Sequence, residues 1–560
     1  MIEVPREPAE YQDALSALRS RLESLVVERN QVTEQRDSYK KAYELAMLEL
    51  ERLRRGLFGR KAEKVDPAQV ALVFEPFRKL LEAAQAPPPA TDADQGGTGS
   101  GNGHAPAKKK PTGRRNLADV ALEIAPVEEI RLVPADLPDG AVELEGETSW
   151  RAEWKKGGWV RLKIVRPRFV VPSTPEQDET GSETTITIAD VPDEMVPRGL
   201  AGPAMLAHVL ASKFADHLPF HRQESILARQ GLELDRGTMC RWAASCHELA
   251  STVVDAMADE ARATAAVIAT DATGVLVQAK EACRRGHFWV CIADEAHVFF
   301  RYTPRHNSEA PKTFLAGFTG YVQADASSVY DAMFRQEDAP TEAGCWAHAR
   351  RKFFESVRSE RQPALVAVGF IGELFAIDRT LKDAPPARRL EVRRARAGPV
   401  LAAFRTWRDA QLARPDLEPR APLTRALRYI ERHWDALTRF LDDGRLRLSN
   451  NWSELELRRL VVGRRNWLFV GSDDGAEVTC TFVSLIGSCA LHRLDPEAYL
   501  RDLFRVLPAW PRSRVLELAP KYWSRTRDRL DPVQLRAHLG PLTVPPPPAP
   551  EQPGQDANAP

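Results

Sequence analysis

The chain has 560 residues, in which 78 Lys and Arg residues are balanced by 78 Asp and Glu residues. A chain of this length is too long for a single hydrophobic core, so we expect three or four modules. Because the net charge is zero, the protein is not uniformly basic, and any nucleic-acid site must come from local basic patches.

The cysteines and the apolar runs indicate the compartment. The seven cysteines include no Cys-x-x-Cys pair and no tight Cys/His cluster, which predicts reduced thiols rather than a disulfide scaffold, and no structural zinc. The N-terminus has no apolar signal core, and no apolar run approaches the ~20 residues of a membrane span. We therefore expect a soluble, cytoplasmic protein.

The N-terminal region has the periodicity of a coiled coil. From Leu15 to Leu57, mostly apolar residues, interrupted by Arg29 and Arg36, recur at alternating spacings of three and four, which is a period of about 3.5 residues. This predicts a dimerising coiled coil over residues 11–65, and the alternative is a long helix that folds back on its own chain. Residues 86–115 are rich in Gly, Pro and Ala and cannot form a core, so they are predicted to be a flexible linker.

The next segment is predicted to be a small β module. Residues 117–197 contain short stretches of alternating polarity, which are typical of strands. Trp150, Trp154 and Trp159 are the expected core of this module, and stacking on nucleic-acid bases is the alternative use for one of them.

Residues 200–250 contain three helical patterns separated by turns, and the third helix carries Arg236, Thr238 and Arg241. This arrangement resembles a helix-turn-helix, whose last helix enters the major groove of DNA. Any helical bundle can show the same pattern, so the three polar residues are candidate DNA contacts on pattern alone.

The segment from residue 265 to 510 has the element order of an RNase H-like domain. Three strand patterns with hairpin-length connections are followed by a helix and by a fourth strand in GYVQADAS. In that fold one acid lies on the first strand and another follows the fourth, which are the positions of Asp271 and Asp325. Two structural alternatives remain open: Asp271 can belong to a simple strand-end turn, and Asp325 can cap the helix that follows it.

A third carboxylate, Glu454, is predicted in the first turn of a helix. The preceding polar turn, residues 449–451, is expected to cap that helix. Three acids from distant segments can hold two divalent cations, which activate water or a 3′-hydroxyl against a phosphodiester. We therefore predict a phosphoryl-transfer enzyme in which Asp271, Asp325 and Glu454 are the catalytic and metal-binding residues.

Basic residues near these acids are candidate DNA contacts. Those that follow His348 and Glu454 along the chain are Arg350, Arg351, Lys352, Arg458, Arg464 and Arg465. His348 can shuttle a proton or contact a phosphate, although a lone histidine at a strand-to-helix junction is more often structural. The apolar run at residues 467–470 is predicted to be a buried anchor beside the basic residues.

Two segments fall outside this plan. Residues 360–445 read as almost wholly helical and exceed what a plain RNase H fold needs, so they are predicted to be an inserted helical domain. The proline-rich residues 543–560 are predicted to be a disordered tail.

Several of these segments make the chain similar to transposases of the insertion-sequence-66 family, the TnpC-type proteins of the DDE class. They include LRRGLFGRKAEK, GYVQADA, GCWAHARRKFFE and GRRNWLFVGSD, and the resemblance runs nearly end to end. It implies an RNase H-like fold with Asp271, Asp325 and Glu454 as the metal-binding triad. It also implies Mg²⁺- or Mn²⁺-dependent cleavage and strand transfer on transposon inverted-repeat ends and target DNA, small accessory proteins, and a nucleoid-associated place in a bacterial cytoplasm.

The sequence departs from this family in three places. Ala272 stands where the family usually has Glu, and Ser449 stands where it usually has Asp. Neither position belongs to the triad. The family also usually carries a small cysteine zinc-binding module before the helix-turn-helix, whereas residues 117–197 contain no cysteine. The β segments must therefore hold together without that metal.

The expected fold class is α+β and multidomain. It combines an N-terminal coiled coil, a small β module, a helix-turn-helix, and an RNase H-like α/β catalytic domain with an all-helical insertion. The predicted function is that of a DNA transposase that forms a homo-oligomer through its coiled coil. The alternatives are a catalytically inactive, domesticated DNA-binding dimer and a different RNase H-like enzyme, such as a resolvase or a structure-selective nuclease.

Overall fold

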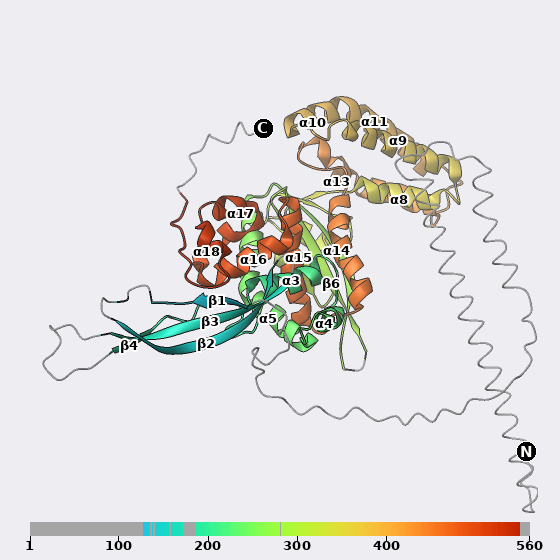
Figure 1. Cartoon of the computed structure of the whole chain (residues 1–560). Helices are drawn as coiled ribbons and strands as arrows, with labels where there is room; N and C mark the ends of the chain where they lie inside the picture. Colours follow the sequence, from blue (N-terminus) through green and yellow to red (C-terminus); the bar gives the residue numbers. More distant parts are fainter. Residues whose placement is uncertain are drawn as a thin grey trace, which may run out of the picture. The chain divides into compact units, whose positions relative to one another are not determined.

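Two β-sheets and a large set of helices form the described part of the protein, which is therefore α+β as predicted (Figure 1). This computed structural model describes residues 127–548, with gaps at 135–136, 138–140, 156–157, 172–184 and 281. All of these residues belong to one compact unit. The predicted coiled coil (11–65), the predicted linker (86–115), residues 117–126 of the predicted β module and residues 549–560 of the predicted tail lie outside the described residues.

The first sheet has four strands and lies within the predicted β module. Its strands are β1 Val127–Arg131, β2 Val142–Lys155, β3 Gly158–Val171 and β4 Thr185–Ile188. β2 and β3 form a long antiparallel hairpin, β1 pairs with β3 in parallel, and β4 pairs with β3 antiparallel. Of the three predicted core tryptophans, Trp159 is buried, whereas Trp150 and Trp154 are only partly buried.

Three helices follow the small sheet: α3 Pro203–Phe214, α4 Phe220–Arg229 and α5 Arg236–Thr264. Asp235 caps α5 by accepting a 2.8 Å hydrogen bond from the Gly237 N–H. α5 is much longer than the sequence pattern predicted, because its second half buries a stripe that packs against α15 (Asp473–Leu491). The predicted domain boundary at residue 250 therefore falls inside one continuous helix.

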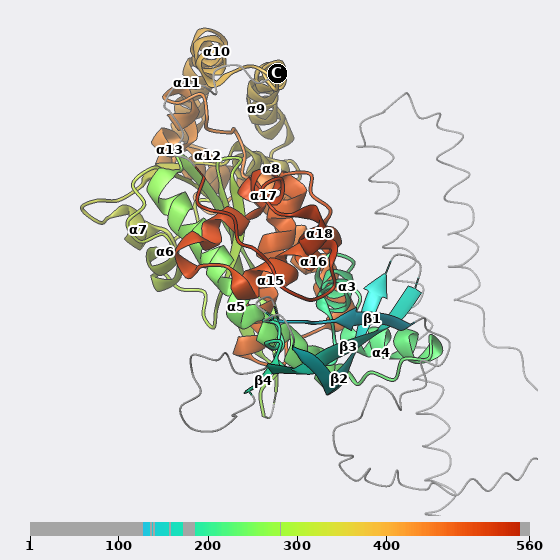
Figure 2. The same cartoon turned by 60° about the vertical axis from the view of Figure 1, so that its left-hand side comes forward.

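The small sheet lies beside α3 (Figure 2), and a buried carboxylate attaches the two. Glu153, on β2, is fully buried and accepts hydrogen bonds from the N–H groups of Ala204 (3.3 Å) and Met205 (2.5 Å). A Cβ atom at Gly202 would lie 2.1 Å from the Glu153 Oε2 atom, so the close approach requires glycine. Glu153 thus caps the N-terminus of a helix from a neighbouring element.

The second sheet has five strands in the order β7-β6-β5-β8-β9. The strands are β5 Val267–Val277, β6 Arg284–Ala293, β7 His297–Thr303, β8 Tyr321–Gln323 and β9 Thr341–Ala343. β5, β6 and β7 pair antiparallel, whereas β8 and β9 run parallel to β5. Two short helices, α6 Glu309–Phe314 and α7 Asp331–Phe334, occupy the crossovers. The predicted strands and their order along the chain match this sheet.

Residues 360–445, predicted as an inserted helical domain, are helical, and together with the preceding helix α8 they form helices with a core of their own. These are α8 Trp346–Ser356, α9 Arg361–Arg379, α10 Pro386–Val392, the π-helical turn η2 Arg393–Ala397, α11 Gly398–Leu412, α12 Pro422–Arg432, α13 Trp434–Thr438 and the 3-10 turn η3 Arg439–Leu441. Trp346, Phe353 and Phe404 are fully buried within it. α8 begins directly after β9, so the end of the sheet and the helical segment are continuous.

The remaining helices pack on the five-stranded sheet and on one another. They are α14 Asn451–Trp467, α15, α16 Pro496–Val506, η4 Leu507–Ala509, η5 Arg512–Leu518, α17 Pro520–Arg527 and α18 Pro532–Arg536. α15 covers the edge strand β7: the hydroxyls of Ser484 and Ser488 accept hydrogen bonds from the N–H groups of Phe300 (2.8 Å) and Val298 (3.0 Å). None of the helices between residues 127 and 548 is long and apolar enough to cross a membrane.

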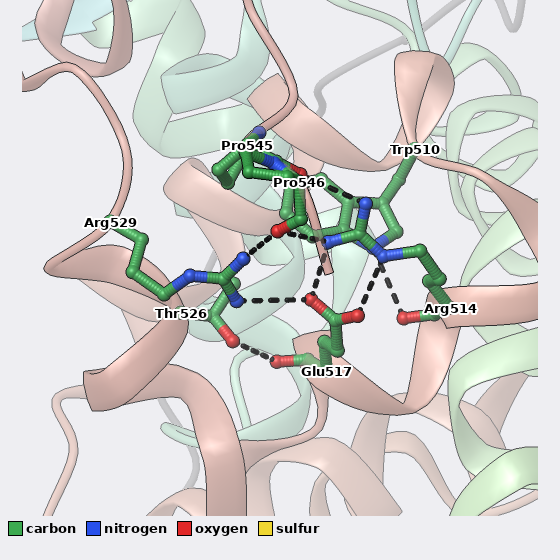
Figure 3. Close-up of polar contacts among 7 residues, drawn as sticks. All are labelled: Trp510, Arg514, Glu517, Thr526, Arg529, Pro545 and Pro546. Carbon is green, nitrogen blue, oxygen red and sulfur yellow. Dashed lines mark hydrogen bonds and ion pairs between the residues drawn. The ribbon is translucent and has the colours of Figure 1, made fainter. Parts of the chain in front are cut away.

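Two arginines contact the start of the proline-rich tail (Figure 3). Arg514 stacks on Trp510, forms an ion pair with Glu517 and donates a 2.9 Å hydrogen bond to the carbonyl of Pro545. Arg529 pairs with the same Glu517 and also donates to the carbonyl of Pro546. Two carbonyls of the segment predicted as a disordered tail, those of Pro545 and Pro546, therefore accept hydrogen bonds from guanidinium groups.

Candidate active site

The register of two parallel strands brings the first two predicted acids together. Ala269 on β5 is paired with Gln323 on β8. Asp271 and Asp325 each lie two residues after these paired positions. Asp271 therefore lies on the central strand level with Asp325, which follows the end of β8. Side chains at such positions on neighbouring strands lie close together.

Asp271 is held in a partly buried position, where its Oδ1 atom accepts a 2.7 Å hydrogen bond from the Ala272 N–H. The pKa of the Asp271 carboxyl is raised to about 7, mainly by burial and also by the charges of Asp325 and Glu454, whereas the hydrogen bond from Ala272 and the charge of Arg351 act to lower it. The three predicted acids are therefore electrostatic neighbours, and their mutual repulsion is part of the cost of the site.

Asp325 occupies a turn rather than the helix cap considered from the sequence. Its Oδ1 atom accepts a 3.0 Å hydrogen bond from the Ser327 N–H, and the next helix, α7, has Tyr330 at its N-cap. Ala326 between them has a φ of 58°, which is unfavourable for a residue with a side chain. A strained backbone next to an acid is typical of functional sites.

Glu454 lies in the first turn of α14, as predicted, with its side chain 35% exposed. Its Oε1 atom is 3.5 Å from the His348 Nε2 atom and 3.6 Å from the Arg351 Nη2 atom, both on α8. Burial lowers the pKa of His348, although the charges of Asp325 and Glu454 raise it. α8 therefore places a cation and an imidazole beside the third acid.

The polar turn before α14 acts differently from the predicted cap. The side chain of Asn450 makes no capping hydrogen bond to the helix; it is fully buried, and its Nδ2 atom donates a 2.8 Å hydrogen bond to the carbonyl of Thr270. Its Oδ1 atom accepts a 2.7 Å hydrogen bond from the Ser453 hydroxyl, and its backbone N–H faces the Cys345 sulfur at 3.2 Å. Asn450 thus ties the helix that carries Glu454 to the strand that carries Asp271.

The predicted anchor at residues 467–470 is largely wrong. Leu468 is 65% exposed and Phe469 is 41% exposed, whereas Val470 is buried and forms a β-bridge with Val277. Only the end of the run is therefore anchored. An apolar run alone does not predict burial when its backbone turns outward.

The predicted DNA-contacting residues are not all available. Arg464 is engaged within the fold, because its guanidinium donates to the Thr273 hydroxyl (2.9 Å) and to the Gly274 carbonyl. The exposed arginines are Arg236, Arg241, Arg350, Arg351, Arg458 and Arg465. Lys352 is half-buried over the ring of Tyr429, and Thr238 accepts a 2.7 Å hydrogen bond from Arg241 at the start of α5. Of all these, the structure brings Arg351 next to the acids.

The donor chemistry of the three acids suits hard divalent cations, which prefer carboxylate oxygens. Among the described residues, no three His, Cys, Asp or Glu side chains are gathered closely enough to hold a metal ion. The like charges of the acids resist a closer approach unless a cation neutralises them.

Replacement of Asn450 is expected to loosen the site. Asn450→Ala leaves the buried Ser453 hydroxyl without its acceptor and removes the link to Thr270, so the free energy of unfolding should fall by about 1–3 kcal/mol. Urea denaturation measures this, with Asn451→Ala, at the exposed neighbouring position, as the matched control. Equal effects of the two substitutions would show that the Asn450 side chain does not link α14 to β5.

Replacement of Asp271 is expected to change the pH dependence of stability. The fold raises the pKa of this carboxyl from its ordinary value of 3.8 to about 7, so its destabilising effect is absent below about pH 4, grows between about pH 4 and pH 7, and is complete above pH 7. Asp271→Asn should therefore stabilise the metal-free protein at pH 8 by about 2–4 kcal/mol.

The gain should disappear towards pH 4, which denaturation of the two proteins in chelator at several pH values would show. Asp259→Asn is the control, because the Asp259 side chain is 70% exposed. A gain that is independent of pH would contradict the assignment of the raised pKa.

Comparison with known proteins identifies the family. The model described as "Transposase IS66 family" matches residues 198–478, the "IS66 C-terminal element" matches 484–520, and the "Transposase C of IS166 homeodomain" matches 46–123. Two similar chains are uncharacterized proteins of Sinorhizobium fredii (strain NBRC 101917 / NGR234). One, y4hP, is 30% identical over 65% of this chain and 70% of its own length, and the other, y4qI, is 28% identical over 84% and 87%. The chain belongs to the IS66 family of transposases.

Proposed function

We propose that this transposase cleaves DNA at transposon ends and joins the freed ends to target DNA, with Asp271, Asp325 and Glu454 as its catalytic residues. The observation that carries the proposal is the meeting of three distant segments. The β5–β8 register aligns the two aspartates, and Asn450 fixes the start of α14 to the same strand.

The topology of the large sheet supports an RNase H-like catalytic domain. Three antiparallel strands are followed by two that run parallel to the first strand, which lies at the centre of the sheet. The acids lie on the first strand, after the fourth strand and on a later helix, in the places that were predicted from the chain order. The helices from α9 to η3, within residues 360–445, would be the insertion between the second and third acids.

The three acids would hold Mg²⁺ or Mn²⁺ ions through their carboxylate oxygens. Bound there, the ions would activate water or a 3′-hydroxyl and stabilise the leaving oxygen of the phosphodiester. Asp271 must give up the proton that its raised pKa retains near neutral pH. Arg351, beside Glu454, would bind the phosphate that is to be cleaved, and His348 would hold the Glu454 carboxylate in place.

The exposed basic residues define the proposed DNA surface. Arg236 and Arg241, at the start of α5, would contact the transposon end in the manner of a recognition helix. Asp235 caps this end of α5, and both arginines are exposed. Arg350 on α8 and Arg458 and Arg465 on α14 would contact the DNA backbone. Arg464 is not part of this surface because it holds β5.

Substitution of the acids tests the proposal. Glu454→Gln and Asp325→Ala should each reduce Mg²⁺- or Mn²⁺-dependent nicking of a supercoiled plasmid that carries the element's ends by at least ~100-fold. Each substitution removes a ligand of the metal ions that would stabilise the charge of the transition state. DNA binding, measured by mobility shift in chelator, should be retained.

The matched control is Glu355→Gln, which changes an exposed glutamate on α8. Cleavage by Glu454→Gln at the wild-type rate would remove Glu454 from the triad. If the wild-type protein binds the ends but cuts nothing in either metal, even with its accessory proteins, the alternative of a catalytically inactive DNA-binding protein would be favoured.

A further inference from the structure

An unusual turn ends the helix that carries Glu454. Leu468 has φ 64° and ψ −47°, and the Phe469 N–H donates a 2.8 Å hydrogen bond to the carbonyl of Trp467. A hydrogen bond that spans three residues around a positive φ defines the rare, strained form of the γ-turn. Glycine adopts such a conformation easily, but the residue here is leucine.

The turn is fixed firmly on both sides. The Leu468 N–H donates to the Arg464 carbonyl at 2.8 Å, so the turn continues the last turn of α14. After it, the Val470 N–H donates to the Leu276 carbonyl and the Val470 carbonyl accepts from the Gln278 N–H, both at 2.8 Å. The strained backbone is therefore imposed by its surroundings and is not a loose loop.

The strained turn leaves two large apolar side chains exposed. The turn directs Leu468 and Phe469 outward, where they are 65% and 41% exposed, while Val470 returns to the core at 9%. Two large apolar side chains are thus held in solvent at an energetic cost. Strain of this kind persists where it presents a side chain to a partner.

The neighbouring face of α14 indicates which partner. Leu455, Arg458, Val462 and Arg465 follow one another at spacings of three and four, so they share one face of the helix, and all four are exposed. Arg465 stands close before Leu468 in sequence. No acid occupies this spacing, since Glu454 faces α8 and Glu456 is buried in an ion pair with Arg459. The face combines cations with apolar groups.

DNA has the complementary chemistry, with phosphates on its outside and apolar base faces within. Leucine and phenylalanine side chains are among those that DNA-bending proteins insert between base pairs, which unstacks the step and kinks the duplex. A protein partner for the same face would need acids as well as apolar residues. The two exposed arginines and the adjacent active site favour DNA.

We propose that Leu468 and Phe469 form a wedge that enters the stacked bases of a duplex whose backbone lies on Arg458 and Arg465. The inference rests on the proposed DNA-cleaving function and adds to it a distortion of the DNA. Leu468 lies roughly 20 Å from Glu454 along α14, at about 1.5 Å per residue. The unstacked step should therefore lie about six base pairs from the cut, at roughly 3.4 Å per base pair.

A fluorescent base tests the wedge. The probe is a duplex of the DNA that flanks the coding sequence, with 2-aminopurine placed at successive positions, mixed with full-length protein in chelator. Unstacking raises 2-aminopurine fluorescence, so a rise confined to one step is expected with the wild-type protein. Leu468→Gly and Phe469→Ala should lose most of that rise while they still bind the duplex.

Leu468→Gly also separates the wedge from a structural role. Because glycine relieves the positive φ, this variant should melt at the same temperature as the wild type or higher, although its DNA distortion is lost. Leu468→Ala keeps the strain and should lose the distortion without the gain in stability. Leu365→Ala, at a 46% exposed leucine on α9, is the control and should retain the full fluorescence rise.

The outcomes are distinguishable. If the wild-type protein binds and nicks the DNA but no position fluoresces, or if Leu468→Gly keeps the rise, the wedge is wrong and the proposed function stands. If the wild-type protein neither binds nor nicks, both are wrong. A change in oligomeric mass in Leu468→Gly, with unchanged fluorescence, would assign the turn to a protein contact and would overturn the wedge.

Discussion

The side-chain amide of Asn450 connects the segments from which the candidate active site is built. It donates to the carbonyl of Thr270, accepts from Ser453 and sits with its backbone N–H against Cys345, all in a fully buried position. Thr270 precedes Asp271, Ser453 precedes Glu454, and Cys345 precedes α8 with its His348 and Arg351. A buried amide left without its partners costs about 1–3 kcal/mol, so this junction has one favourable arrangement. That arrangement holds the start of α14, which carries Glu454, against the strand that carries Asp271.

The site that this junction creates is costly in its metal-free form. Asp271 holds its proton to about pH 7 because burial and two nearby carboxylates disfavour its charge. Ala326, beside Asp325, and Leu468, at the end of α14, both adopt positive φ values. At Leu468 the surrounding hydrogen bonds hold the strained backbone, because the Leu468 N–H donates to the Arg464 carbonyl and the Val470 N–H donates to the Leu276 carbonyl.

Much of this arrangement could be predicted from the sequence, because it depends on local patterns. The strands of the large sheet, the helical insertion and the place of each acid after a strand or near a helix start follow from polarity and chain order. Other features depend on tertiary contacts and could not be predicted. Asparagine is a residue type that often caps helices. The side chain of Asn450 instead donates its hydrogen bond to the carbonyl of Thr270 on the neighbouring strand. The run at 467–470 reads as core, yet its backbone turns outward.

The small sheet shows how a module without cysteines is held in place. Glu153 in β2 caps α3, Trp154 stacks on His208 at 4.3 Å, and His538 near the C-terminus faces Glu128 at 3.2 Å and Glu153 at 3.7 Å. These carboxylates raise the pKa of His538, which favours its charged form. A buried charge needs such a partner, because an unpaired carboxylate in the interior is strongly unfavourable. The end of the chain therefore contributes to the attachment of its first described strands, and an ionic cluster joins elements that are nearly 400 residues apart, from Glu153 to His538.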